Sequence, residues 1–542
     1  MVRKEIKELT KDAILQAQSE KLLADFELPE ILVEKAPDEK FGDYSSNVAL
    51  KIAKQTGKPP MDVAQIITNE AKDICEGPAC IAEKIEAVKP GFINFFISKA
   101  HLAKKISTIL ERKENYGSLD IGQGQKVQVE FISANPTGPL TLGNGRGGFL
   151  GDTLASVLKK AGFNVAREYL INDAGYQVKV LGHSILKDEL AQYKGDYVDM
   201  LVEKLKDASK DPREVGYQAA QHIMEIMIKP VAEQRMKIKF DNWFSEKKLR
   251  QSGALEKVLK LLKEKGLTYE NEGALWFKSS EFGDDKDRVL VTSGQTEKGV
   301  EGTYFLQDIA YHFNKLVERK FEKVIDIWAA DHHGYVARLL AAKEALQMPG
   351  ELTIIVTQLV KLFREGKEVR MSKRAGLYVT IEELLDEIPL DVVRFFFLMY
   401  SIDTHMNFDL DLAKEKSEKN PVYYVQYAYA RISSILRKAQ NNFQFPISNF
   451  QLLNHPAEMA LIKQLIRLPE IIEDTARDYQ VQRLPQYALD LVRAFHKFYE
   501  ECRVIDDKNP ELTSARLALV EATRIVLKNT LDLMGVSSPE SM

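Results

Sequence analysis

The sequence predicts a protein of several domains built around an α/β unit with a parallel sheet. A strand-like run at 127–131, a loop, a helical run at 146–161 and a strand-like run at 164–171 follow one another. That order is typical of a βαβ unit, whose two strands are parallel. From about residue 389 onward the apolar side chains show only helical spacing. At 542 residues the chain is also longer than one hydrophobic core usually organises.

The first expected domain is an α+β unit covering 1–112. A polar turn at 41–47 precedes a helical run at 48–54, and 90–97 is expected to be a turn followed by a strand. The charged, glycine-bearing stretch 111–124 is typical of a linker.

The second expected domain, 113–388, contains the βαβ unit. Further strands are expected at 323–328 and 352–356. The stretch 185–270 is charged and mostly of helical pattern, and we interpret it as an insertion.

The third expected domain, 389–542, is an all-α bundle. Apolar residues recur there at steps of three and four, in two stripes: Leu484, Tyr487, Leu491, Phe495, Phe498 and Cys502, and Tyr424, Tyr427, Arg431 and Ile435. We expect these stripes to be core packing. Tyr423 and Tyr427 could also stack on nucleic-acid bases, although burial on a helix face is the simpler interpretation.

Composition adds few constraints. The formal charge of −4 neither predicts nor excludes a nucleic-acid partner, because binding needs only a local basic face. Three cysteines are too few for a disulfide framework and indicate a reducing compartment. The N-terminus has no apolar signal segment, and no run reaches the roughly 18 apolar residues of a membrane span. A cytoplasmic protein is expected.

The loop at 130–148 carries the clearest chemistry. Its glycines and prolines lie between a strand and a helix, where free N–H groups can hold a phosphate. The triplet Gly143, Gly145 and Gly148 also spells a dinucleotide fingerprint, with Glu168 near the end of the next strand. However, residues 133–142 intervene after the strand, whereas in that fold the first glycine follows almost at once. The spacing disfavours a dinucleotide site.

Taken whole, the loop resembles the first signature, "HIGH", of class I aminoacyl-tRNA synthetases, over the residues Asn135-Pro-Thr-Gly-Pro-Leu-Thr-Leu-Gly-Asn144. With Glu130-Phe before it and Gly-Arg after it, it resembles the arginyl-tRNA synthetases. Thr141 and Asn144 stand where that family has two catalytic histidines that donate hydrogen bonds to ATP phosphates. The resemblance implies nucleotide contacts for the backbone and side chains of this loop at Pro136, Gly138 and Gly143.

Arg370-Met-Ser-Lys-Arg-Ala-Gly376 resembles the second signature, "KMSKS", with Arg370 in place of its first lysine. The resemblance makes Lys373 the catalytic lysine that meets the pyrophosphate end of ATP, with Met371 and Ser372 beside the nucleotide. Alone, such a lysine would be interpreted as a surface residue. The order and spacing of the two signatures favour the functional interpretation.

Tyr304 and Asp308 lie four residues apart, on one face of an expected helix. A phenol and a carboxylate side by side could hold a guanidinium, although Asp308 could equally be a solvated or capping acid. The resemblance implies that they bind arginine, and that Glu130 and Asn135 hold its amino-acid end.

Asp331 and His332 follow the expected strand 323–328, at the edge where doubly wound sheets bind ligands. An Asp-His-His run invites a metal interpretation, but no third ligand is at suitable spacing. The resemblance implies contacts with the ribose and adenine of ATP.

The resemblance covers nearly the whole chain. It implies a Rossmann-like catalytic domain, an N-terminal additional domain that touches the tRNA, and a C-terminal anticodon-binding bundle. It also implies ligation of L-arginine to its tRNA through an adenylate, using ATP with Mg²⁺. We expect a monomer without a tightly bound metal, and a charge-paired arginine pocket whose discrimination makes a separate editing domain unnecessary. Members commonly need bound tRNA to activate arginine.

Three alternatives stay open. The chain could be a non-catalytic tRNA-binding paralogue, disabled by Thr141 and Asn144. It could be a synthetase for another amino acid, against which Tyr304 and Asp308 argue. A nicotinamide-dependent oxidoreductase is the third alternative.

Overall fold

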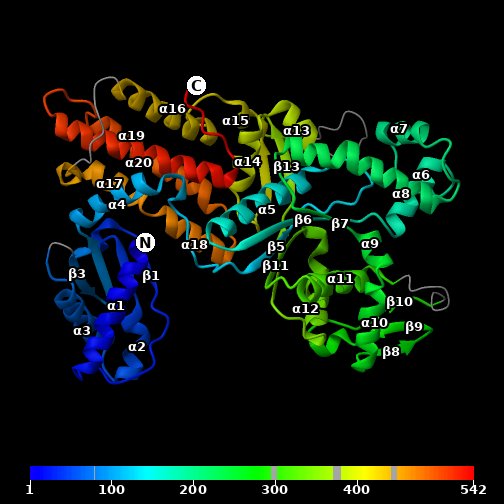
Figure 1. The fold of residues 1–542 in the computed structure, drawn as a ribbon, viewed down its shortest axis with the longest axis horizontal. Helices are drawn as coiled ribbons and strands as arrows, with labels where there is room; N and C mark the ends of the chain where they lie inside the picture. The colour runs from blue at the N-terminus through cyan, green and yellow to red at the C-terminus, as the bar shows by residue number, and fades with distance from the viewer. Residues whose placement is uncertain (78–79, 294–301, 370–379, 441–448) are drawn as a thin grey trace.

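The computed structural model describes residues 1–77, 80–293, 302–369, 380–440 and 449–542. In Figure 1 the N-terminal part (blue) lies beside the C-terminal helices (orange to red) at one end of the molecule. The helices of residues 176–223 lie at the opposite end, and the central sheet lies between. Across these ranges, no helix is both long enough and apolar enough to cross a bilayer.

The N-terminal part is a four-stranded antiparallel sheet with helices against it, in strand order β1-β2-β4-β3. The strands are β1 (Val33–Lys35), β2 (Tyr44–Ser46), β3 (Ala82–Val88) and β4 (Phe92–Ile97). The helices packed on the sheet are α1 (Val2–Ser19), α2 (Val48–Thr56) and α3 (Pro60–Ile74), whereas α4 (Lys99–Arg112) packs against helices of the C-terminal part. The predicted strand at the end of 90–97 is β4. The predicted polar turn at 41–47 also contains β2, which pairs with β4.

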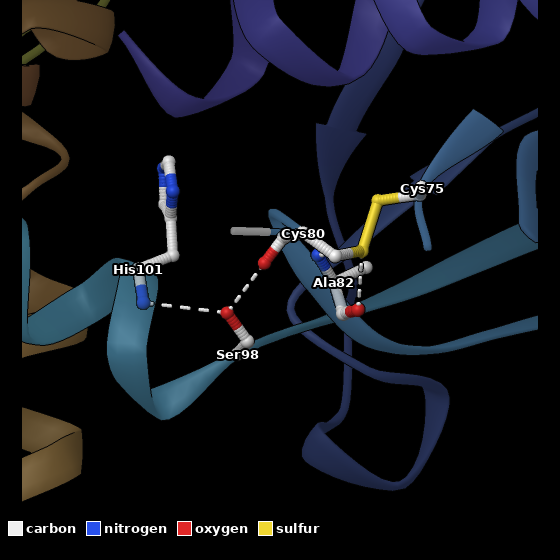
Figure 2. The surroundings of a disulfide bond; sticks show 5 residues. All are labelled: Cys75, Cys80, Ala82, Ser98 and His101. Carbon is white, nitrogen blue, oxygen red and sulfur yellow. Dashed lines mark hydrogen bonds between the residues drawn. A yellow bond between two sulfur atoms is a disulfide. The ribbon is translucent and has the colours of Figure 1, made fainter. Parts of the chain in front are cut away.

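Cys75 and Cys80 form a disulfide bond between the end of α3 and the start of β3 (Figure 2). Their Cα atoms are 4.9 Å apart, a separation that a disulfide spans. The low cysteine count did not predict this bond, because two cysteines brought together locally are sufficient. Ser98 donates a hydrogen bond to the Cys80 carbonyl at 2.7 Å and accepts one from the backbone N–H of His101, so the bridge adjoins the start of α4 (Figure 2).

The central sheet has five parallel strands in the order β12-β11-β5-β6-β7. They are β5 (Lys126–Glu130), β6 (Asn164–Ile171), β7 (Asn242–Ser245), β11 (Lys323–Ala329) and β12 (Glu351–Thr357). The four strands predicted from the sequence are confirmed, and β7 was missed. Parallel strands place their carboxyl ends at one edge, where ligands bind.

Helices connect these strands. They are α5 (Leu142–Lys160) between β5 and β6, α11 (Tyr304–Phe313) with the π-helical turn η6 (Asn314–Glu318) before β11, and the 3₁₀ turn η7 (Ala330–Tyr335) with α12 (Val336–Ala345) after it. Helix α5 begins four residues before the predicted start at 146. Its N-terminus therefore coincides with the first signature.

The stretch expected to be a helical insertion, 185–270, contains α7 (Asp196–Lys204), α8 (Pro212–Ile223), α9 (Glu246–Gln251) and α10 (Ala254–Glu264). The helix α6 (Tyr176–Leu186) lies almost entirely before it. A Cβ on Gly182 of α6 would lie 1.8 Å from the Pro212 carbonyl oxygen, so only glycine allows α6 and α8 to pack this closely. Between α8 and α9 the chain forms β7, so 185–270 also contributes to the central sheet. A small antiparallel sheet follows, made of β8 (Thr268–Asn271), β9 (Ala274–Phe277) and β10 (Arg288–Val291).

The C-terminal part is mostly helical. Its helices are α13 (Ile381–Glu387), α14 (Leu390–Leu398), α15 (Leu410–Lys414), α16 (Pro421–Gln440), α17 (Pro456–Leu465), α18 (Leu468–Asp478), α19 (Arg483–Glu501) and α20 (Pro510–Met534). The expectation of helix alone beyond 389 is wrong at β15 (Met406–Asp409), which joins β13 (Val360–Arg364) and β14 (Lys367–Val369) in a small sheet. The stripe from Leu484 to Cys502 is buried, as the sequence predicts.

Polar contacts join the N-terminal and C-terminal parts. The Tyr44 hydroxyl donates to Glu470 of α18 at 3.0 Å, and the Arg3 backbone N–H donates to the same carboxylate at 3.1 Å. The stretch expected to be a linker is also anchored, because Asn529 of α20 donates to the carbonyls of Lys113 and Tyr116.

A buried arginine joins the catalytic and C-terminal parts. Arg394 of α14 is 1% exposed and pairs with Asp152 of α5. It also donates to the carbonyls of Met236 and Met534, each at 2.9 Å. The Arg394 guanidinium of α14 therefore contacts both α5 and α20.

Candidate active site at the carboxyl edge of the parallel sheet

The loop between β5 and α5 is fixed by hydrogen bonds to its backbone. The Tyr169 hydroxyl donates to the Ala134 carbonyl at 3.0 Å, and the Tyr197 hydroxyl donates to the Thr137 carbonyl at 2.8 Å. Within the loop Pro136 is buried, while Asn135 is exposed. A Cβ on Gly138 would lie 3.4 Å from the Tyr197 hydroxyl, so the loop approaches Tyr197 closely.

Thr141 and Asn144 cap α5. The Asn144 backbone N–H donates to the Thr141 hydroxyl oxygen at 3.4 Å, and the Thr141 N–H donates to Asn144 Oδ1 at 2.9 Å, which is a capping box. The Thr141 hydroxyl also donates to Asn144 Oδ1 at 2.9 Å. The hydroxyl proton is therefore used inside the cap, and Asn144 Nδ2 is the side-chain donor that remains for a ligand.

The glycines of α5 divide into two kinds. A Cβ on Gly143 would have only the Thr141 hydroxyl oxygen within 4 Å among the described residues, at 3.7 Å. A Cβ on Gly145 would lie 2.6 Å from Ile381, and one on Gly148 would lie 2.9 Å from Ile132. All three positions are inside the helix, not in a turn before it. Gly145 and Gly148 serve packing, and Gly143 leaves room for a ligand.

The described chain resumes after the second signature at Thr380, and there it lies against the first signature. Thr380 forms an isolated antiparallel bridge with Thr141, and the Ile381 N–H donates to the Leu140 carbonyl at 2.9 Å. Candidates Met371, Ser372 and Lys373 lie outside the described residues. The chain that follows them nevertheless begins beside the N-terminus of α5.

Tyr304 and Asp308 lie on the first turns of α11, as predicted. Tyr304 is 45% exposed, and its hydroxyl lies 3.4 Å from where a Cβ on Gly175 would be, at the start of α6. Asp308 is half-buried, and its carboxylate has no hydrogen-bond or ion-pair partner within the described ranges. Burial, reinforced by the nearby carboxylates of Glu246 and Glu130, raises the pKa of Asp308 to about 7. A cation bound here would relieve that cost.

Beneath Asp308 lies a charged network that the sequence did not reveal. Lys315 of η6 has no exposed side-chain surface, and its ammonium pairs with Glu130 of β5 and Asp326 of β11. His312 donates from Nδ1 to the Asp308 carbonyl at 2.7 Å, and its Nε2 lies 2.6 Å from Asp326 Oδ2. Burial raises the pKa of Glu130, while Lys315 opposes the rise. Only the fold brings these residues together.

Glu168 has a structural role. Its carboxylate accepts hydrogen bonds from Tyr311 at 2.6 Å and from Asn242 at 2.6 Å, and it is paired with Arg319. Its oxygens are thus occupied by protein donors and are not presented to a ribose. This contact, with the helical position of Gly143, removes the grounds for a dinucleotide site.

Asp331 and His332 lie in η7, directly after β11 and at the carboxyl edge of the sheet. Their side chains are outside what the structure describes. Their backbone position agrees with the edge predicted from the sequence.

An aromatic ladder lies on α16. The rings of Tyr423 and Tyr427 stack with centroids 6.1 Å apart, and the Arg431 guanidinium lies 4.9 Å from the Tyr427 ring. Tyr499 of α19 is 41% exposed and lies 5.6 Å from the same guanidinium. Tyr423, Tyr427 and Arg431 are half-buried, so the ladder is not part of the core.

Three family profiles match the chain. They are described as "Arginyl tRNA synthetase N terminal domain" over 4–97, "tRNA synthetases class I (R), catalytic domain" over 202–393 and "DALR anticodon binding domain" over 425–542. With the parallel sheet and its capped loop, these matches define a class I aminoacyl-tRNA synthetase.

Curated relatives give the particular family. The chain is 41% identical to arginine–tRNA ligase of Acetivibrio thermocellus, over 100% of this chain and 99% of the relative. It is 42% identical to arginine–tRNA ligase of Bacillus velezensis, over 100% of both chains. The chain belongs to the arginyl-tRNA synthetase family. Nothing in these matches favours a non-catalytic paralogue.

Solved structures agree. A putative arginyl-tRNA synthetase from Campylobacter jejuni is 32% identical, covers 82% of this chain and 100% of its own, and superposes with a TM-score of 0.73. Thermus thermophilus arginyl-tRNA synthetase is 23% identical, covers 100% of both chains and gives a TM-score of 0.78, which supports the fold.

Proposed function

We propose that this protein ligates L-arginine to its cognate tRNA in two steps at the carboxyl edge of the central sheet. The arginine carboxylate attacks the α-phosphate of ATP, and pyrophosphate leaves. A ribose hydroxyl at the 3′ end of the tRNA then attacks the arginyl-adenylate, and AMP leaves. Mg²⁺ enters with ATP as part of the nucleotide substrate, where it offsets charge on the leaving group.

The arginine pocket rests on one observation, the carboxylate of Asp308, which has no hydrogen-bond or ion-pair partner among the residues that the structure describes. A half-buried acid with a pKa of about 7 is poised to accept a cation. Tyr304 lies four residues before it on α11, so a guanidinium can contact the phenol and the carboxylate together. Glu130 and Asn135 are assigned to the amino-acid end of the substrate. An analogue without the guanidinium would leave Asp308 unpaired, which discriminates without an editing domain.

The ATP site is assigned to the N-terminus of α5. Asn144 Nδ2 and the free N–H groups of the first turn would face the phosphates, and Gly143 would allow the adenine to lie against backbone. Thr141 acts by keeping the cap in place. The bend of the loop at Pro136 and Gly138 holds this surface.

The remaining nucleotide contacts follow the family resemblance. Lys373 is assigned to the pyrophosphate as charge builds on it, with Met371 and Ser372 alongside. Asp331 and His332 are assigned to the ribose and adenine. Little protein acid–base chemistry is needed, because positioning and charge stabilisation supply most of the rate.

We further propose that the protein acts as a monomer in the cytoplasm, with its N-terminal part on the tRNA body and its C-terminal helices on the anticodon. The ladder of Tyr423, Tyr427 and Arg431 is a suitable stacking surface for bases.

The deciding experiment is ATP–pyrophosphate exchange with and without arginine, each in the presence and absence of cognate tRNA. We expect arginine-dependent exchange that a Lys373→Ala variant loses. Exchange no higher than in that variant, with every substrate present, would overturn the proposed function. The comparison without tRNA tests whether activation requires it.

A further inference from the structure

Lys315 lies at the centre of the charged network but has no role in the site as assigned so far. Its ammonium pairs with Glu130 and lies 2.8 Å from Asp326 Oδ1, and it sits 4.2 Å from the centre of the Tyr311 ring. The side chain is fully buried, in η6 directly after the helix that carries Tyr304 and Asp308. Removing one partner from a buried ion pair leaves an uncompensated charge, so the orientation and ionisation of Glu130 and Asp326 depend on this ammonium.

We propose that Lys315 is a positioning residue for arginine, which holds Glu130 directly and Asp308 through Asp326 and His312. The inference rests on the roles proposed above for Glu130 and Asp308. It adds a residue that neither the signatures nor the substrate contacts assign.

The contact with Glu130 fixes the orientation of that carboxylate. Lys315 binds Glu130 Oε2, and the Ser133 hydroxyl donates to Oε1 at 2.8 Å. Both oxygens therefore have a defined partner before substrate arrives. Because Ser133 belongs to the loop of the first signature, the same carboxylate also ties β5 to the ATP side of the site.

The contact with Asp308 passes through two residues. Lys315 and His312 bind opposite oxygens of Asp326, Oδ1 and Oδ2. The other ring nitrogen of His312 donates to the backbone carbonyl of Asp308 itself. The ammonium, one carboxylate and one imidazole thus form a continuous chain from β5 to the turn that presents Asp308.

Charge gives Lys315 a second effect. The carboxylates of Glu130, Asp326 and Glu168 face its ammonium, together with the Tyr311 ring. Glu130 in turn faces Lys315, Asp326 and His312. Without the ammonium, Glu130 and Asp326 would share a buried space as two like charges, so one of them would take up a proton. A protonated Glu130 is a poor partner for the α-ammonium of arginine.

Arg319 offers a matched control. It directly follows the same π-helical turn and pairs with a buried acid, Glu168, although its own side chain is 24% exposed. Replacing it removes a partly buried cation from the same segment and leaves the Glu130 contact in place. A general loss of stability would therefore appear in both variants.

The experiment measures arginine-dependent pyrophosphate exchange by the full chain with tRNA present, from pH 6 to 9, for wild type, Lys315→Met, Lys315→Arg and Arg319→Met. We expect Lys315→Met to raise the arginine KM at least about tenfold at pH 7, the effect of losing one charge-assisted contact. The ATP KM should change less than about twofold. Because removal of the ammonium raises the pKa of Glu130, the defect should shrink as the pH rises. Lys315→Arg should restore most of the affinity, and Arg319→Met should stay within about threefold of wild type.

Two results overturn the inference while leaving the proposed function intact: an unchanged arginine KM in Lys315→Met at every pH, or an equal KM defect in Arg319→Met. If Lys315→Met fails to fold by circular dichroism, Lys315→Gln replaces it, since the amide keeps a donor but no charge, and the same outcomes apply. A wild-type protein without arginine-dependent exchange would instead overturn the proposed function, and this inference with it.

Discussion

Asp308 offers a test in which stability and affinity should change in opposite directions. Its carboxylate is half-buried among acids, and its pKa is raised to about 7 from the usual 3.8, chiefly by burial. An Asp308→Asn substitution keeps the size of the side chain and removes the charge. We expect the variant to be more stable than wild type without substrate, and to bind arginine poorly.

The sign and size of the expected stability change follow from proton linkage. Between about pH 4 and 7 the folded protein keeps a proton on Asp308 that the unfolded chain has released, so this group lowers stability as the pH rises through that window. At about 1.4 kcal/mol per pH unit the loss approaches about 4 kcal/mol above pH 7, an upper limit for a half-buried group. The asparagine variant avoids that loss. The stability advantage of the variant over wild type should be smaller at pH 4, where Asp308 of the folded wild type is already neutral.

Two assays check this reasoning. The first is thermal unfolding of both proteins without substrates at pH 5 and pH 8, where the advantage of Asp308→Asn should be larger at pH 8. The second is the arginine KM in pyrophosphate exchange. Loss of a charge pair with the guanidinium, about 2 kcal/mol or more, predicts a rise of at least about 30-fold at pH 8.

Wild type should show a matching pH profile. If arginine requires the ionised carboxylate, its KM should be about tenfold higher at pH 6 than at pH 8, because a group with a pKa of about 7 is mostly protonated at the lower pH. Glu246→Gln removes one of the acids that raise this pKa, so the midpoint should move to lower pH. The groups facing Asp308 also include His312, Glu130 and Lys315, which stay in place. An arginine KM that Asp308→Asn leaves unchanged would refute the assignment.

Three further predictions concern the loop and the ladder. Gly143→Ala should fold normally but raise the ATP KM about tenfold or more. Gly145→Ala should instead lower the melting temperature, because its Cβ would meet Ile381 at 2.6 Å. Equal melting temperatures for the two variants would contradict this distinction. Asn144→Asp keeps the cap oxygen but removes the Nδ2 donor and adds charge, so the ATP KM should rise while helix content by circular dichroism stays constant. Tyr427→Ala should raise the KM for tRNA about 5- to 100-fold, the usual range for losing a stacked base, with the arginine KM unchanged; an unchanged tRNA KM would show that the ladder does not meet bases.

The sequence predicts the central sheet well because its strands are short apolar runs with clear limits. The strand β6 has the predicted bounds, 164–171. The predicted start of helix α5 was too late, because the first turns of this helix are rich in glycine, which usually indicates a loop. In these turns the capping box and close packing outweigh the low helix propensity of glycine. The strands β7 and β15 have four residues each, too few to show a pattern, and exist only through distant pairing.

The candidate site was predictable where chemistry follows a local motif. Thr141, Asn144, Tyr304 and Asp308 could all be selected from spacing and resemblance. Lys315 could not, because its partner Glu130 is 185 positions away and a lysine in a polar helical stretch is normally interpreted as exposed. Asp326 was hidden in the same way, inside an apolar strand. A single charged residue within a buried strand is the signal that could have revealed it.

The guanidinium of Arg394 has a practical consequence for anyone dividing this protein. A cut between 388 and 389, where the sequence suggests a boundary, would take Arg394 away from Asp152 and from the Met236 carbonyl. It would leave the half-buried Asp152 carboxylate paired with Arg167 but without the Arg394 guanidinium. Asp152 lies on α5, the helix whose first turn is proposed to hold ATP. An isolated catalytic fragment should therefore include α14. If such a fragment loses activity without α20, the loss would reflect missing contacts between the two parts of the protein, not a contribution of anticodon binding to catalysis.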